Sequence, residues 1–188
     1  TPTVLYSGNM GRKQALDQAV TLAEHLARRN ANVRIVLRGD GTLREWIEAE
    51  IGTRGLSNIV VESLVPDDKL NQALAEAHIH LIPQDPRGAD YAVPSKIYNI
   101  LAAGRPIVCT AMEGSTLWEL SQQTKAIVCV PPNRPDVLAD KIVELIGDTE
   151  TLERMGSQGR EYVCEHAERE KVLSSYLRVV AGPYGSGA

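Results

Sequence analysis

The sequence has few cysteines, no long apolar run and no strong excess of either charge. Its three cysteines, Cys109, Cys129 and Cys164, include no closely spaced CxxC-type pair and are expected to be isolated. This pattern argues against a disulfide framework or a zinc site and favours a reducing compartment. No apolar run approaches the roughly 20 residues of a membrane span, and no signal-peptide pattern opens the chain. With 20 basic and 24 acidic residues the net charge is −4, and this mild acidity argues against nucleic-acid binding.

What remains is typical of an ordinary globular domain. The 188 residues are 43% apolar and 23% charged, which is enough to form a full core and excludes disorder as the main state. No internal repeats or low-complexity blocks occur. The chain begins with Thr1 rather than Met, and a strand-like run starts within three residues. We therefore expect the chain to be part of a longer protein.

Two kinds of apolar segment alternate along the chain. Short runs that are apolar throughout indicate buried strands at 3–7, 33–37, 59–61, 78–82, 107–109 and 126–130. Apolar residues at helical spacing indicate helices at about 15–27, 43–51, 67–77, 95–102, 135–146, 150–164 and 168–180. Apolar strands separated by helices predict a parallel sheet covered on both faces. We expect a Rossmann-like, three-layer α/β domain with a parallel sheet of about six strands over residues 1–181, and a linker or tail at 182–188.

In such sheets ligands bind at the carboxyl ends of the strands, near the point where the strand order reverses. The segments expected there are 8–13, 39–41, 64–68, 84–96 and 110–115. Two of them lead into helices through residues that are able to cap a helix. Asp67 is expected to cap the helix at 67–77, and Ser95 the helix at 95–102.

The first loop has features of a phosphate site. Gly8 and Gly11 allow the backbone to approach a ligand closely, and the amide-rich start of the next helix is expected to point to the same place. Arg12 and Lys13 add positive charge. The pattern Gly-x-x-Gly is not the dinucleotide fingerprint. The alternative is a tight turn that carries two solvated bases.

The second and third loops give weaker indications of ligand binding. Gly39 and Gly41 could bring backbone near a ligand, although such glycines more often only form a turn. Around Val65, apolar packing and backbone hydrogen bonds could hold a flat base. The alternative for this third loop is a plain connection with a helix cap.

The fourth segment is the most informative. Ser95 and Lys96 lie at a helix start, where a cation is unfavourable unless an anion is bound there. Asn99 lies one turn further on the same helix face and could bind a sugar hydroxyl. The alternative is a solvated lysine and an asparagine that the helix merely tolerates.

These residues together resemble the donor-binding, carboxy-terminal half of retaining glycosyltransferase family four, which has the two-domain B-type fold. The resemblance runs from Val4 to about Val180. Within it, residues 93–108 are similar to the bacterial exopolysaccharide and O-antigen branch of the family, including colanic-acid-type and N-acetylfucosamine-transferring members. The strings that carry the resemblance are YSGNMGRK (6–13), VLRGDG (36–41), AHIHLIP (77–83) and VPSKIYNILAAGRPIV (93–108).

The resemblance implies that these loops bind a nucleotide diphosphate sugar. Lys13 matches the diphosphate-binding lysine of the family, and Asn9 stands where many members have an arginine, whose charge Arg12 would then supply. The family has two glutamates eight positions apart. They fall on Tyr91, beside Asp90, and on Asn99, so neither carboxylate is kept in register.

The function implied is donor recognition in a glycosyltransferase that adds a sugar to a lipid-linked or saccharide acceptor during cell-surface polysaccharide synthesis. Most catalytic groups would belong to an amino-terminal half outside this chain, with Lys13 and Lys96 stabilising the leaving diphosphate. The chain alone is expected to bind a UDP-, GDP- or TDP-sugar without turnover and without a metal, since no Asp-x-Asp motif occurs. The full-length enzyme is expected in the cytoplasm, at the inner face of the membrane.

Two alternatives stay open. The first is half of a non-hydrolysing nucleotide-sugar epimerase, which shares the B-type architecture but needs carboxylates and a histidine that the loop around Asp85 and Asp90 does not clearly provide. The second is a non-catalytic α/β domain that binds a protein partner.

Overall fold

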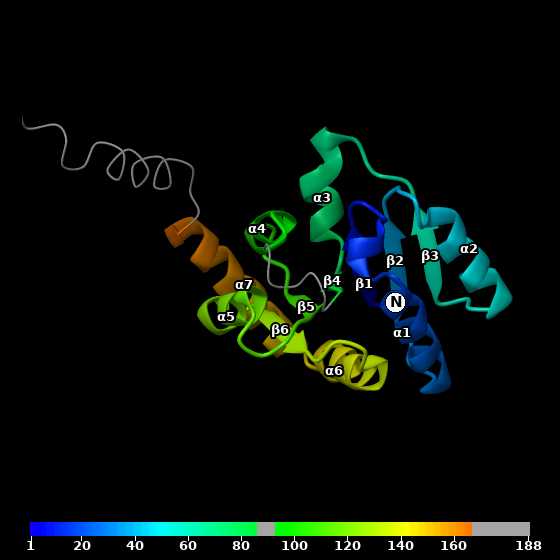
Figure 1. Ribbon diagram of the computed structural model, residues 1–188. Helices are drawn as coiled ribbons and strands as arrows, with labels where there is room; N and C mark the ends of the chain where they lie inside the picture. The colour runs from blue at the N-terminus through cyan, green and yellow to red at the C-terminus, as the bar shows by residue number, and fades with distance from the viewer. Residues whose placement is uncertain (86–92, 167–188) are drawn as a thin grey trace, which may run out of the picture.

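A parallel six-stranded sheet forms the centre of the molecule (Figure 1). The computed structural model describes residues 1–85 and 93–166. The strand order is β3-β2-β1-β4-β5-β6, so the order reverses between β1 and β4. The strands are β1 (Thr3–Ser7), β2 (Arg34–Arg38), β3 (Ile59–Glu62), β4 (Ile79–Ile82), β5 (Ile107–Thr110) and β6 (Ile127–Val130).

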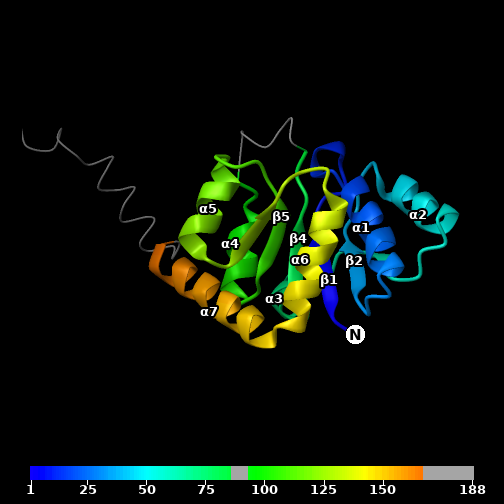
Figure 2. The ribbon, with the colours of Figure 1, turned by 90° about the horizontal axis from the view of Figure 1, so that it is seen from below.

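Helices cover both faces of this sheet (Figures 1 and 2). One face carries α1 (Asp17–Arg28), α2 (Arg44–Thr53) and α6 (Pro135–Gly147), and α1 packs against α6. The other face carries α3 (Leu70–Ala75), α4 (Lys96–Ala102) and α5 (Thr116–Thr124). The last helix, α7 (Thr149–His166), packs against α4 and α5 and also against α6, so it contributes to the core on both faces. Two short 3-10 helices, η1 (Arg12–Gln14) and η2 (Asp67–Lys69), precede α1 and α3.

The core explains why apolar strands and amphipathic helices alternate. All four residues of β4 and of β5 are buried, as expected for central strands covered on both faces. On the first face, α1 buries an apolar stripe against β1 and β2. On the second, α4 and α5 form a separate apolar cluster with β5 and β6. The predicted Rossmann-like α/β class with about six parallel strands is confirmed.

Several local predictions were wrong. The side chains of Asp67 and Ser95 make no capping hydrogen bond, and Asp67 lies inside η2 rather than before a helix. The helix expected at 67–77 is divided into η2 and a short α3. Cys109 and Cys129 are not isolated, because they lie opposite each other on paired strands.

One helix, α5, was not predicted from the sequence. Its buried positions have helical spacing, but Ser121 and Thr124 occupy two of them, so the apolar signal is weak. Ser115 caps this helix by accepting a hydrogen bond from the backbone N–H of Trp118 at 3.3 Å. The predicted helix at 168–180 and tail at 182–188 lie outside the described residues.

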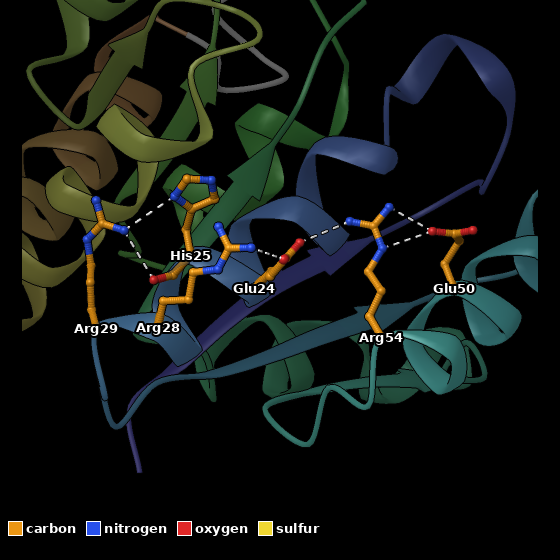
Figure 3. A network of polar contacts seen from close by, with 6 residues as sticks. All are labelled: Glu24, His25, Arg28, Arg29, Glu50 and Arg54. Carbon is orange, nitrogen blue, oxygen red and sulfur yellow. Dashed lines mark hydrogen bonds and ion pairs between the residues drawn. The ribbon is translucent and has the colours of Figure 1, made fainter.

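A surface network of ion pairs links α1 to the end of α2 (Figure 3). Arg54 contacts Glu50 at 2.7 Å and Glu24 of α1 at 3.2 Å. All three side chains are partly exposed, so water and salt screen these pairs and each contributes little to the stability of the fold. Over the part of the chain that the structure describes, none of the helices is long and apolar enough to cross a bilayer.

Candidate functional site

The site to consider is the carboxyl edge of the sheet where the strand order reverses. The loop after β1 begins at Gly8, and the segment after β4 leads to Lys96 at the start of α4. Open parallel sheets leave a crevice at this place, because the connections after the two adjacent strands go to opposite faces. The first and fourth predicted segments therefore meet at the expected point.

The loop after β1 is held by the loop after β2. Gly8 donates its backbone N–H to the carbonyl of Arg38 at 2.9 Å, and Met10 donates to Asp40 at 2.7 Å. In return, Leu43 donates to the Met10 carbonyl at 2.9 Å. These hydrogen bonds fix the backbone of the first loop without any ligand.

The close contact of the two loops accounts for the glycines of the second. A Cβ atom on Gly39 would lie 1.9 Å from the Gly8 carbonyl oxygen, which is far inside contact distance. Gly41 has a φ of +147°, and a Cβ there would lie 2.6 Å from Oδ1 of Asn9. Both glycines are thus needed for the packing of the protein's own backbone, whether or not a ligand approaches them.

A buried tyrosine supports the first loop from below. Tyr6 is 1% exposed, and its hydroxyl donates a hydrogen bond to the carbonyl of Asn9 at 2.5 Å. Burial raises the pKa of this phenol well above its usual value, so Tyr6 stays neutral. The asparagine side chain itself is exposed at the tip of the loop.

Lys96 reaches across the reversal point to the same loop. Its Nζ atom lies 4.0 Å from the centre of the Tyr6 ring and 3.4 Å from the carbonyl of Ser7. A Cβ on Gly8 would lie 3.3 Å from this Nζ, so the cation is next to the glycine backbone. Burial lowers the pKa of Lys96 to about 8. An anion bound here would replace part of the solvation that this ammonium group lacks.

The backbone amides at the start of α4 offer fewer free N–H groups to a bound anion than the sequence predicted. Ile97 and Tyr98, at the start of α4, donate to the carbonyls of Pro94 and Ser95 at 3.0 and 3.3 Å. Their N–H groups are therefore already bonded. Ser95 is exposed at the N-cap position, where its hydroxyl is open to solvent.

The first helix begins two residues later than predicted, at Asp17, and a short 3-10 turn lies between it and the loop. Arg12 and Lys13 lie in η1 and are exposed, and Ala15 in a left-handed conformation separates them from α1. The backbone N–H groups of Gln18 and Ala19 already donate hydrogen bonds to preceding backbone carbonyls. The positive charge next to Gly11 therefore comes from side chains on a short turn rather than from a helix start.

Four other predicted residues lie elsewhere in the chain, two of them in its described part. Asn99 is exposed on α4, one turn after Lys96, and Val65 is half-buried in the loop after β3. Asp90 and Tyr91 lie outside the described residues. The structure thus brings Gly8, Lys96 and the loop of Asn9 together, while the roles of the whole predicted set in binding stay predictions.

Near this edge of the sheet, hydrogen bonds between buried polar groups join α1 to the strand ends, and the sequence analysis did not predict them. Gln18 of α1 is 6% exposed and donates to the carbonyl of Gln84 at 3.3 Å. Gln84 in turn donates its backbone N–H to the hydroxyl of Thr110 at 2.9 Å. The link joins α1 to the ends of β4 and β5. A polar residue within the apolar stripe of α1 was the signal available in the sequence.

Comparison with known proteins identifies the class. The family described as "Glycosyl transferases group 1" matches residues 1–148, and the chain belongs to this family. The glycosyl transferase WcaI of Escherichia coli K12, named for colanic acid biosynthesis, is 32% identical over 180 residues, covering 95% of this chain and 43% of that protein. The alpha-D-kanosaminyltransferase of Streptomyces kanamyceticus is 26% identical over 155 residues, covering 82% of this chain and 39% of that enzyme. The chain thus spans less than half the length of these relatives.

Solved structures agree with the fold. Staphylococcus aureus TarM, crystallised with UDP among other ligands, superimposes with a TM-score of 0.80 at 16% identity, covering 94% of this chain and 35% of TarM. Anabaena HepE in complex with UDP-glucose gives a TM-score of 0.78 at 15% identity, covering 96% of this chain and 49% of HepE. The domain accordingly has the fold of one half of a B-type glycosyltransferase.

Proposed function

We propose that this chain is the donor-binding half of a retaining family four glycosyltransferase that takes a nucleotide diphosphate sugar. The observation that carries the proposal is the position of the Lys96 ammonium group against the Gly8 loop, at the reversal point of the sheet. A half-buried cation beside a glycine backbone suits a diphosphate, since a charge-assisted hydrogen bond is about twice as strong as a neutral one. Family membership favours a glycosyltransferase over the epimerase alternative.

The chemistry at this site is stabilisation of the leaving group. When the sugar–phosphate bond breaks, negative charge develops on the diphosphate, and Lys96 lies where it would meet that charge. Lys13 and Arg12, on the exposed η1 turn, would supply further positive charge. Asn99 would bind the ribose, and Val65 would contact the base. Ser95 would join Lys96 at the diphosphate, and Asp90 and Tyr91 would lie toward the sugar.

The remainder of the enzyme is proposed by analogy with its relatives. An amino-terminal domain outside this chain would hold the acceptor, which we propose is lipid-linked or a saccharide of a cell-surface polysaccharide, because WcaI is named for such a pathway. The reaction would take place in the cytoplasm, at the inner face of the membrane. We propose that no metal is required, since lysines supply the charge that a metal would otherwise bring.

Calorimetry with UDP-, GDP- and TDP-sugars tests the proposal. We expect one nucleotide class to bind and the chain alone to show no transfer. Absence of binding across the panel would instead favour a non-catalytic, partner-binding domain. Binding in Lys96→Ala equal to that of the parent chain would place the site elsewhere.

A further inference from the structure

Cys109 and Cys129 are 20 residues apart in the sequence and neighbours in the sheet. β5 and β6 pair in register so that the two cysteines lie directly opposite each other, and their Sγ atoms are 3.3 Å apart. Both side chains lie in the apolar cluster below α5. The proposed nucleotide site uses neither thiol.

The two thiols differ in their surroundings. Cys109 is fully buried, whereas Cys129 is partly exposed and lies close to the Leu117 carbonyl of α5. The hydrogen bond from Cys109 lowers the pKa of Cys129 to about 7, and Ser121 acts in the same direction, while burial opposes both. The pKa of Cys109 is raised by the same hydrogen bond and by burial. The pair therefore favours a thiolate at the more accessible sulfur and a thiol at the buried one.

We propose that Cys109 and Cys129 form a site of reversible oxidation by hydroperoxides, at which an intramolecular disulfide joins β5 to β6. In the first step the Cys129 thiolate attacks the peroxide, the O–O bond breaks, and Cys129 becomes a sulfenic acid while hydroxide or alkoxide leaves and takes up a proton. In the second step Cys109 loses its proton and its sulfur displaces hydroxide from Cys129, so that the S–S bond forms, the S–O bond breaks and water leaves. An external dithiol reverses the reaction by thiol–disulfide exchange.

The fold allows this bond without separating the strands. Neighbouring strands lie about 4.8 Å apart, which is within the range of roughly 4.4–6.8 Å between the Cα atoms of a disulfide. Starting from 3.3 Å, the two sulfurs need to approach by little more than about 1 Å to reach a bond length of about 2.05 Å. Rotation of the two side chains is the main movement required.

The test uses a Cys164→Ser chain, which removes the exposed cysteine of α7 and leaves only the proposed pair. After treatment with stoichiometric hydrogen peroxide, we expect both thiols to be lost together, the intact mass to fall by two hydrogen atoms, and dithiothreitol to restore both. With Cys109→Ser added, Cys129 should instead be trapped by dimedone as a sulfenic acid. With Cys129→Ser added, the buried Cys109 should stay unmodified.

Other results would overturn the proposal. These are a gain of oxygen without a cross-link, disulfide-linked dimers, or two thiols that survive excess peroxide. Cross-linking should be at least about tenfold faster in the native chain than in urea, because the fold holds the sulfurs together; an equal rate would mean that unfolding produces the bond. If circular dichroism shows that Cys164→Ser does not fold, peptide mapping of the oxidised parent chain must give the 109–129 cross-link, and its absence is equally decisive.

Discussion

If Lys96 binds the diphosphate as proposed, its lowered pKa should make nucleotide-sugar binding depend on pH in a defined window. In the free chain burial holds this pKa at about 8, whereas a bound diphosphate would stabilise the ammonium form and raise the pKa toward its ordinary value. The protonated form is the one that binds. Affinity is therefore highest well below pH 8 and falls as the pH rises through that value, until the pKa of the complex is reached.

The size of the effect follows from the protonated fraction. With a pKa of about 8, roughly nine-tenths of the Lys96 side chains are protonated at pH 7 and about one-tenth at pH 9. The dissociation constant should thus rise about tenfold between these values, which corresponds to about 1.4 kcal/mol. Binding at pH 9 should also take up close to one proton from the buffer.

Calorimetry of the best-binding nucleotide sugar at pH 7, 8 and 9 measures both quantities, since buffers of different ionisation enthalpy report the proton uptake. Lys96→Met keeps most of the length of the side chain but removes the charge, and should bind weakly with no dependence on pH. Lys13→Ala is the matched control: it removes an exposed lysine and should bind more weakly while keeping the tenfold change. Lys96 would be wrongly assigned if the dissociation constant of the parent chain did not change with pH, or if it changed by the same factor in Lys96→Met.

Four further outcomes are expected. Lys13→Ala and Lys96→Ala should each weaken nucleotide diphosphate binding by ~1.5–3 kcal/mol at pH 7, measured by calorimetry, and unchanged affinity in both would contradict the site. Binding should weaken as salt rises but survive a chelator, whereas loss that added divalent metal restores would reject the metal-free proposal. Asn99→Ala should weaken UDP by ~0.5–1.5 kcal/mol and leave a 2′,3′-dideoxy analogue unchanged, so equal losses would remove Asn99 from the ribose. Gly39→Ala should destabilise the fold by about 3 kcal/mol or more in urea unfolding, because its Cβ meets the Gly8 carbonyl, while Gly52→Ala, which meets nothing within 4 Å, should be neutral or stabilising.

The positions of the strands follow from local features of the sequence. Each strand is a short apolar run, and the structure places all six at or within a residue or two of the predicted bounds. The two helices with a full apolar stripe, α1 and α6, were predicted equally well. α5 was not, because two of its buried positions carry hydroxyl side chains whose suitability depends on β6 and α7 packing beside them.

The groups that meet at the carboxyl edge could not be identified without the three-dimensional arrangement of the strands. The contact of Lys96 with Tyr6 and Gly8 joins residues from two distant segments, and it arises because the strand order places β4 beside β1. The same holds for Cys109 and Cys129, which spacing alone left as separate thiols and the register of β5 with β6 makes neighbours. Spacing in the sequence reports contacts along one helix or strand, whereas contacts between elements depend on sheet order and register, which the packing of the whole domain sets.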